Sequence, residues 1–149
     1  MGYELREIPG EATISDAHAV RREVFIEEQN VSEAEEMDGR DEAASHVVAY
    51  AVEDATTDET PVGTARLRVP KPGVGKAERV AVCKPYRGDG VGLQLMTAIE
   101  DVAREQGCDR MKLHAQTAVE AFYRKLGYET TSDVFMEADI PHVKMEKQL

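Results

Sequence analysis

KAERVAVCKPYRGDGVGLQLMTAIEDVAREQ, residues 76–106, is the stretch of sequence that decides the fold. A short apolar segment, Lys76 to Val82, leads into a turn containing Gly88, Gly90 and Gly92, and this turn opens directly into a helical pattern. The first N–H groups of a helix have no partner within the helix and lie at the positive end of its dipole, so they bind anions when no side chain blocks the approach. The stretch therefore predicts a strand, a glycine turn and a helix that together form an anion site.

The segments on either side of this stretch predict a mixed sheet. His46 to Val52 and Pro61 to Val69 are rich in β-branched residues, and with residues 76–82 they are expected to form an antiparallel meander. Met111 to Ala115 is expected to be a strand parallel to residues 76–82, because the helix over residues 90–106 provides the crossover that a parallel pair needs.

The two ends of the chain complete the predicted domain. The remaining expected elements are an opening strand ending at Ile8, a helix that ends near Glu28, a shorter helix over residues 119–126, and closing strands around Asp139-Ile140-Pro141. We expect one α/β (α+β) domain over residues 1–149, with a mixed, mostly antiparallel sheet that splays at its parallel strand pair and is flanked by helices.

Composition restricts the class of protein. The 29 acidic and 18 basic residues give a formal net charge of -11, which argues against nucleic acid as a partner. No apolar run approaches the length of a membrane span, and the N-terminus lacks a secretory pattern, so we expect a cytoplasmic protein without a membrane partner. The two cysteines, Cys83 and Cys108, lack metal-binding spacing; we expect reduced thiols and no metal.

Acidic residues are concentrated between Glu23 and Glu42, where nine acids accompany one base, Arg40. Such a stretch is either a solvated surface or a rim that attracts cations, and solvated surface is the interpretation we favour. The acidity of the whole chain has two interpretations as well, adaptation to concentrated salt and attraction of cationic substrates.

Three glycine motifs compete for the turn at residues 87–92. A Walker loop requires Gly-Lys-Ser/Thr at its end, but Gly92 is followed by Leu93 and Gln94. A dinucleotide fingerprint requires G-x-G-x-x-G after the first strand of a parallel sheet, whereas this chain has G-x-G-x-G after an antiparallel meander. The remaining pattern is R-x-x-G-x-G, from Arg87 to Gly92.

This pattern resembles the pyrophosphate loop, Q/R-x-x-G-x-G/A, of the GNAT superfamily of acyl-CoA-dependent N-acyltransferases. The resemblance covers nearly the whole domain, including the order of elements and AFYRKLGY at residues 121–128, which looks like the family's second cofactor helix. Further matches are similar to the ElaA-like branch: VFIEEQ at residues 24–29, EMDGRD at residues 36–41 with His46 beyond, and IPHVKM at residues 140–145.

The resemblance implies a binding site for acetyl-CoA, held largely by the backbone. Strand residues would pair with the pantetheine arm, and loop N–H groups would hold the pyrophosphate. The cofactor-binding residues implied in this way are Val80, Ala81, Val82, Arg87, Gly88, Asp89, Gly90, Val91 and Gly92.

The resemblance also implies two catalytic residues. Tyr123 would protonate the departing CoA thiolate. Its spacing with Val119, Phe122 and Leu126 also fits a half-buried aromatic residue on the core face, but with AFYRKLGY in place we favour the acid. Glu78 is the candidate base that would deprotonate the attacking amine, directly or through a water, and a residue that faces solvent or forms ion pairs is an equal alternative.

Several other polar residues are further candidates for a role in the site. His46 is an alternative base, but a single histidine at the start of a strand is more often structural, and the same holds for His114 and His142. Gln116 stands near the position where many family members have Asn. Cys83 is expected to be a buried, inert thiol, because direct transfer needs no covalent cysteine.

The resulting hypothesis is an acetyl-CoA-dependent N-acetyltransferase that moves an acetyl group directly to a primary amine of a small molecule or peptide. The alternatives are a non-catalytic acyl-CoA-binding sensor or interaction module and, with less support from the motifs, a nucleotide-binding protein. One chain does not reveal the oligomeric state, for which a homodimer is the assembly we consider.

Overall fold

The computed structural model describes residues 2–8, 14–52 and 59–149. The strands are β1 (Gly2–Ile8), β2 (Ser45–Val52), β3 (Glu59–Lys71), β4 (Val74–Val82), β5 (Arg110–Gln116), β6 (Glu129–Thr130), β7 (Phe135–Glu137) and β8 (Ile140–Gln148). The helices are α1 (Ile14–Arg21), the π-helix η2 (Arg22–Glu28), α2 (Glu33–Glu36), the 3₁₀ turns η3 (Lys84–Tyr86) and η4 (Thr117–Val119), α3 (Val91–Glu105) and α4 (Glu120–Lys125).

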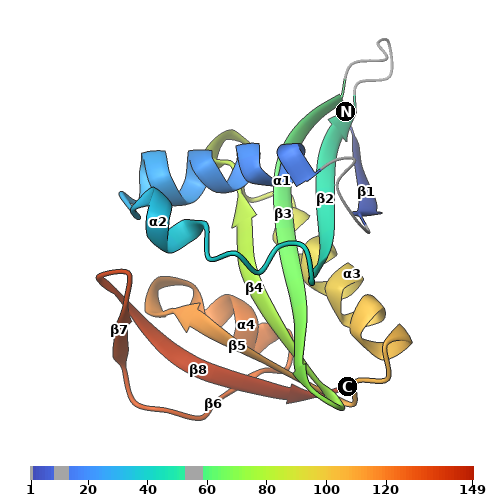
Figure 1. The fold of residues 1–149 in the computed structure, drawn as a ribbon, viewed down its shortest axis with the longest axis vertical. Coiled ribbons are helices and arrows are strands. Elements are labelled where there is room, and N and C mark those ends of the chain that lie inside the picture. Colours follow the sequence, from blue (N-terminus) through green and yellow to red (C-terminus); the bar gives the residue numbers. More distant parts are fainter. Residues whose placement is uncertain (1, 9–13, 53–58) are drawn as a thin grey trace.

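The described strands form one sheet in the order β1-β2-β3-β4-β5-β8-β6, with β7 paired to β8 (Figure 1). Strands β1 to β4 are an antiparallel meander, and β4 and β5 are the parallel pair. The predicted α/β fold, with its mostly antiparallel sheet and one parallel pair flanked by helices, is therefore confirmed.

Helices cover both faces of this sheet. Along β2, Val47, Ala49 and Ala51 belong to the apolar core beneath α3, whereas Val48 and Tyr50 pack with α1 on the other face. This alternation is what a strand covered on both sides requires. Helix α3 is the predicted amphipathic helix, and its buried apolar side chains are Val91, Leu95, Met96, Ile99, Val102 and Ala103.

The parallel pair is short, and its two strands then separate. Pairing runs from Val74 opposite Arg110 to Ala77 opposite Leu113, but β4 continues to Val82. A bulge interrupts β4 at the point where it separates from β5. There Arg79 has a φ of 54°, and the register between β3 and β4 shifts. Since a bulge bends its strand, this one directs the end of β4 away from β5. The predicted splay is thereby present, and the β5-facing edge of β4 beyond Ala77 has no partner strand among the described residues.

The N-terminal helix ends where the sequence predicts. Helix α1 continues without a break into η2, which ends at Glu28 and is followed by Asn30 at a φ of 58°. No helix within the described ranges is long and apolar enough to cross a membrane.

Candidate active site

A cleft of about 1060 Å³ opens where β4 and β5 separate. It is lined by the end of β4, the loop of residues 87–92, α4, β5, β8 and residues from the segment 24–40. Several of the predicted cofactor residues line it together: Val80, Ala81, Val82, Arg87, Gly88, Gly90, Val91 and Gly92.

The start of α3 has the geometry of an anion site. Gly90 precedes the helix with a φ of 83°, and no side chain caps the first turn. Gly88 also has a positive φ, of 90°, and a Cβ at Gly88 or Gly90 would meet no described atom within 4 Å. The first N–H groups of α3 are therefore open to the cleft, as the glycine spacing predicts.

The two charged residues of this loop make other contacts. Arg87 donates to the Val82 carbonyl at 2.8 Å and to both carboxylate oxygens of Glu28 at 2.8 and 2.9 Å. Asp89 accepts a hydrogen bond from the Tyr3 hydroxyl at 2.7 Å. The Arg87 and Asp89 side chains thus tie the loop to the rest of the domain.

Tyr123 is held by neighbouring aromatic rings on the floor of the cleft. Its ring lies edge-on to Phe122, with centroids 5.0 Å apart, and to Tyr128, at 6.0 Å. Only 7% of the residue is exposed, and burial raises the pKa of its hydroxyl. The hydroxyl donates no hydrogen bond to any described residue. Tyr123 is therefore a neutral phenol at physiological pH, and both of its predicted roles, core aromatic and proton donor, are compatible with this position.

Glu78 also lines the cleft, surrounded by basic side chains. Arg66 approaches at 2.9 Å, Arg68 at 2.5 and 3.1 Å, and Lys76 at 3.3 Å. Burial opposes ionisation of Glu78, but the hydrogen bond from Arg68 and the nearby positive charges outweigh it and lower the pKa to about 2. Such a carboxylate is a weak base on its own, because basicity falls with pKa.

The alternative bases occupy different places. His46 lies outside the cleft lining and is buried; burial lowers its pKa, and its Nε2 is 3.0 Å from the Asp41 carbonyl oxygen. His114 and His142 line the cleft with Glu137 between them, at 3.0 Å from His114 Nδ1 and 3.6 Å from His142 Nε2. Each histidine was predicted singly as structural, and the cluster forms only because β5 and β7 both pair with β8, for which the sequence has no local signal.

The end of the cleft is bridged by two amides. The side chains of Gln29 and Gln116 exchange hydrogen bonds at 2.9 and 3.4 Å across the space between η2 and β5. Gln116, whose polar role was left open, is therefore part of the cleft wall.

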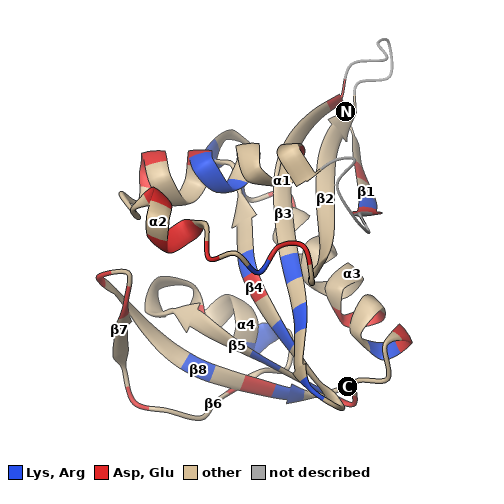
Figure 2. Cartoon of the chain, in the orientation of Figure 1, with Lys and Arg blue, Asp and Glu red and all other residues tan. Residues whose placement is uncertain are grey.

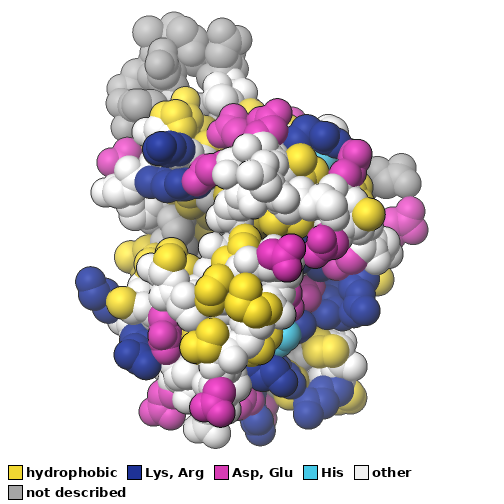
Figure 3. Space-filling view, turned by 90° about the vertical axis from the view of Figure 1, so that its left-hand side faces the viewer, with side chains coloured by type: hydrophobic (Ala, Val, Ile, Leu, Met, Phe, Trp, Pro, Cys, Tyr) yellow, Lys and Arg dark blue, Asp and Glu magenta, His cyan; other side chains and the backbone are white. Residues whose placement is uncertain are grey.

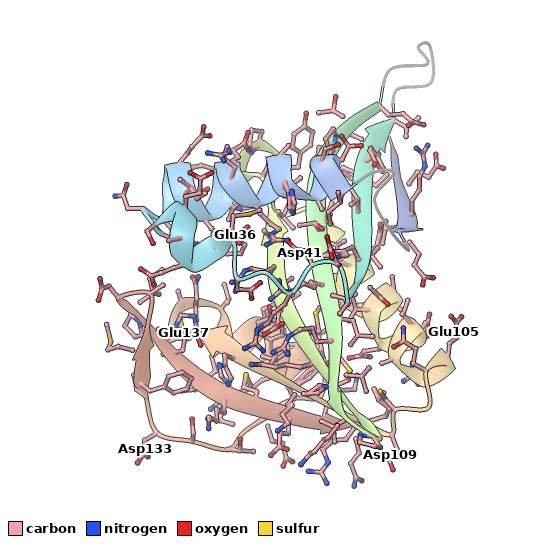
Figure 4. The ribbon with its side chains drawn as sticks, viewed as in Figure 1. Glu36, Asp41, Glu105, Asp109, Asp133 and Glu137 are labelled. Atoms are coloured by element: carbon pink, nitrogen blue, oxygen red, sulfur yellow. The ribbon has the colours of Figure 1, made fainter. Side chains whose placement is uncertain are left out.

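The solvated interpretation of the acidic stretch is wrong for its central residues. Glu36 is only 2% exposed and pairs with Arg21 at 2.5 Å and Arg79 at 3.0 Å. Asp41 bridges Arg21 at 2.7 Å and Arg66 at 3.0 Å. Figure 4 shows Glu36 and Asp41 on the segment that crosses in front of the sheet. Buried arginines on α1 and β3 account for the difference, because a buried cation requires anionic partners.

The cysteines match their prediction. Both are buried and free. Burial, with a hydrogen bond to Glu23, raises the pKa of Cys83 to about 12, which makes it an unreactive thiol. Among the described residues, no group of three or more His, Cys, Asp or Glu side chains is arranged to hold a metal ion.

An open helix N-terminus lies beside an unpaired strand edge in this cleft, the arrangement that the resemblance to acyl-CoA-dependent acyltransferases implies. A sequence model of the acetyltransferase (GNAT) domain matches residues 10–149. Two Bacillus subtilis (strain 168) relatives, the uncharacterized protein YyaT and the uncharacterized N-acetyltransferase YjcF, are each 42% identical, covering 97% and 92% of this chain and 95% and 94% of their own. The chain belongs to the GNAT acetyltransferase family.

Solved structures agree with this assignment. A candidate N-acetyltransferase from Lactobacillus plantarum is 32% identical, with a TM-score of 0.88 over 100% of this chain and 99% of that one. Escherichia coli ElaA superimposes with a TM-score of 0.83 at 24% identity, over 99% of this chain and 100% of ElaA, so the predicted likeness to ElaA is confirmed for the fold. The PaiA N-acetyltransferase of Thermoplasma acidophilum, in complex with coenzyme A, shares the fold at 16% identity and a TM-score of 0.71, with full coverage of both chains.

Proposed function

We propose that this protein is an acetyl-CoA-dependent N-acetyltransferase that transfers the acetyl group directly to a primary amine. The observation that carries the proposal is the presence, in one cleft, of the uncapped start of α3, the unpaired edge of β4 and the Tyr123 ring. The structure of a relative in fold with coenzyme A bound supports the choice of cofactor.

Backbone groups would bind acetyl-CoA. N–H groups of the 87–92 loop receive the pyrophosphate, because the first N–H groups of α3 have no partner within the helix. The Arg87 N–H is the exception, since it donates to the Lys84 carbonyl at 3.3 Å. Residues Val80, Ala81 and Val82 accept the pantetheine amides along the free strand edge, as an added strand would pair. Arg87 and Asp89 contribute by anchoring the loop through Glu28 and Tyr3.

The reaction forms one bond and breaks one. The nitrogen of a neutral amine attacks the thioester carbonyl carbon, and the carbon–sulfur bond then breaks to release CoA thiolate. Tyr123 donates its phenolic proton to the sulfur. Burial raises the pKa of this hydroxyl and keeps the proton on the oxygen until negative charge develops on the departing sulfur.

The amine must lose a proton, and Glu78 is our proposed acceptor. With a pKa of about 2 the carboxylate is a weak base, so it would take this proton through an intervening water as the carbon–nitrogen bond forms and then release it to solvent. Arg66 and Arg68 fix the carboxylate geometry.

Binding and catalysis are tested separately. Acetyl-CoA is expected to raise the melting temperature, whereas ATP and NAD are not, because only a ligand of the folded state stabilises it. Stabilisation by ATP alone would exclude the acyl-CoA assignment. Acetyl-CoA binding without turnover of any amine in a broad panel would instead favour the non-catalytic sensor.

The acid is tested by removing one oxygen atom. Tyr123→Phe is expected to lower kcat about 10²- to 10⁴-fold while CoA affinity stays unchanged, since general-acid catalysis contributes roughly that factor. Tyr50→Phe is the matched control, because this tyrosine packs with α1 outside the cleft. Equal kcat values for the two variants would remove Tyr123 from the acid role.

A further inference from the structure

One face of the central strands is lined with charged side chains. Register places Arg66 opposite Glu78 and Arg68 opposite Lys76, and Lys76 is beside Lys112. The intervening residues, such as Leu67 and Ala77, lie in the apolar core beneath α3. The charged face is therefore the one opposite α3, and beyond the acidic segment it is uncovered (Figure 2).

A second cavity, of about 310 Å³, lies on this face and adjoins the cleft, with which it shares Arg40, Arg68, Lys76, Leu113 and His114. We call it the basic pocket. Its charged lining consists of Arg40, Arg68, Lys76, Lys112, Lys144 and Glu146. Figure 3 shows basic side chains gathered beside a histidine in the lower half of the molecule, with acidic ones above. Five cations thus surround one small cavity in a chain whose net charge is -11.

These cations are only partly neutralised. Arg68 and Lys76 share the single carboxylate of Glu78. Glu146 pairs with Arg110 at 3.2 Å, and Arg40, Lys112 and Lys144 form no ion pair with a described residue. Adjacent like charges repel, so this arrangement favours an anion that enters from solution.

We propose that the basic pocket binds an anionic group, a carboxylate or a phosphate, of the acceptor whose amine is acetylated. This assignment rests on the proposed function and names its substrate class. It also argues against a polycationic acceptor in the basic pocket, because five cations and one carboxylate line that pocket.

The phosphates of CoA would lie elsewhere. Lys76 and Val82 are six residues apart on β4, about 20 Å in an extended strand, and the pyrophosphate loop begins beyond Val82. Lys76 and Glu78, in contrast, are two residues apart on the same face, about 7 Å. An acceptor that spans from the pocket to the proposed base therefore carries its amine and its anionic group on a short spacer.

The first test measures anion binding without catalysis. The probes are inorganic phosphate and acetate, titrated separately into the ¹⁵N-labelled protein. Saturable shifts of backbone amide signals are expected around Lys76, Lys112 and Lys144, and the Lys112→Gln/Lys144→Gln double variant should lose them. Lys71→Gln is the matched control, because Lys71 is an exposed lysine of β3 outside both cavities. Absent shifts, or shifts retained in the double variant, would overturn the proposal.

The second test compares acceptors that differ only in charge. Amino carboxylates and aminoalkyl phosphates of increasing spacer length are assayed against the corresponding amino amides and amino alcohols. The charged member of at least one pair should have a kcat/KM about tenfold higher or more, the size of one charge-assisted hydrogen bond. The double variant should remove that preference by raising the acceptor KM, while the KM for acetyl-CoA stays unchanged.

The outcomes separate the two proposals. Transfer to neutral amines with equal or better efficiency would overturn the acceptor assignment and leave acetyl transfer in place. Anion binding at the pocket with no transfer to any amine would overturn both. Preference for phosphate over carboxylate, or the reverse, identifies which anion the pocket selects and supports the assignment in either case.

Discussion

The two sides of the cleft are built from different kinds of interaction. The loop side, consisting of residues 80–92 with α4, offers backbone groups positioned by glycines and by apolar packing. The charged side, consisting of residues 29–41 and the charged face of β3, β4, β5 and β8, is a network of ion pairs that reaches the buried Arg21 and Arg66.

Backbone groups and side-chain networks are suited to different ligands. A backbone site binds what every family member shares, because its geometry tolerates changes of side chain. The charges of a side-chain network, in contrast, change with each substitution. Such a network can therefore distinguish one acceptor from another. In our proposal, the loop side therefore binds the cofactor, and the charged side determines which acceptor is selected.

The largest effect on stability should come from removing one member of a buried ion pair on the charged side. Glu36→Ala deletes the carboxylate that receives Arg21 and Arg79 and leaves Arg21 with Asp41 as its remaining anionic partner. We expect a loss of about 3 to 5 kcal/mol in the free energy of unfolding, measured by urea denaturation, because the fully buried Arg21 loses the carboxylate that binds its Nε and Nη2, and breaking a buried ion pair is costly.

Glu33→Ala is the control for this variant. Glu33 pairs with Arg22 at 2.7 Å, but their side chains are 65% and 53% exposed, so the change should cost about 1 kcal/mol or less. Equal costs for the two variants would show that ion pairing does not hold the 29–41 segment on the sheet.

The charged side should also make stability depend on acid pH. The folded-state pKa of Glu78 is about 2 rather than the usual 4.5, so the unfolded chain takes up this proton first as the pH falls. The stabilisation is complete above about pH 4.5 and is lost between that pH and about 2, which amounts to about 3 kcal/mol from Glu78. Asp38 and Asp41 have lowered pKa values for the same reason and add to the loss.

Urea unfolding at a series of pH values between 5 and 2 measures this effect. Glu78→Gln should reduce the pH dependence, because an amide cannot titrate. A slope that is the same in Glu78→Gln and the unmodified protein would show that Glu78 has an ordinary pKa, and its ion pairs would then contribute little.

The sequence predicted the loop side far better than the charged side. The meander, the parallel pair and α3 follow from apolar periodicity and from glycines within a few residues of each other, and these are local signals. The burial of Glu36 depends on Arg21 and Arg79, which are 15 and 43 positions away. Composition alone therefore made a structural ion pair look like solvated surface.

The parts of the site near the acceptor were hidden for the same reason. Lys112 and Lys144 line the same pocket only because β5 and β8 pair. His114 approaches Glu137 only because β7 turns back to pair with β8. No spacing in the sequence encodes these contacts. The IPHVKM segment contains two of the residues concerned, but the pattern does not indicate what they face.

The smallest expected change in stability comes from glycine substitutions at the two ends of α3, which test the loop side. Gly90 and Gly107 have nearly the same φ, 83° and 84°, and open space around the position of a Cβ. Gly90→Val and Gly107→Val should each cost about 1 to 2 kcal/mol of stability through left-handed backbone strain.

Only the variant at the loop should affect the cofactor. Gly90→Val places methyl groups beside the N–H groups of α3, so CoA affinity measured by calorimetry should fall about tenfold or more, a difference of about 1.4 kcal/mol. Gly107 lies beyond the other end of α3, and its variant should bind CoA normally. If both variants lose affinity to the same degree, general destabilisation explains the loss, and residues 87–92 are not the pyrophosphate site.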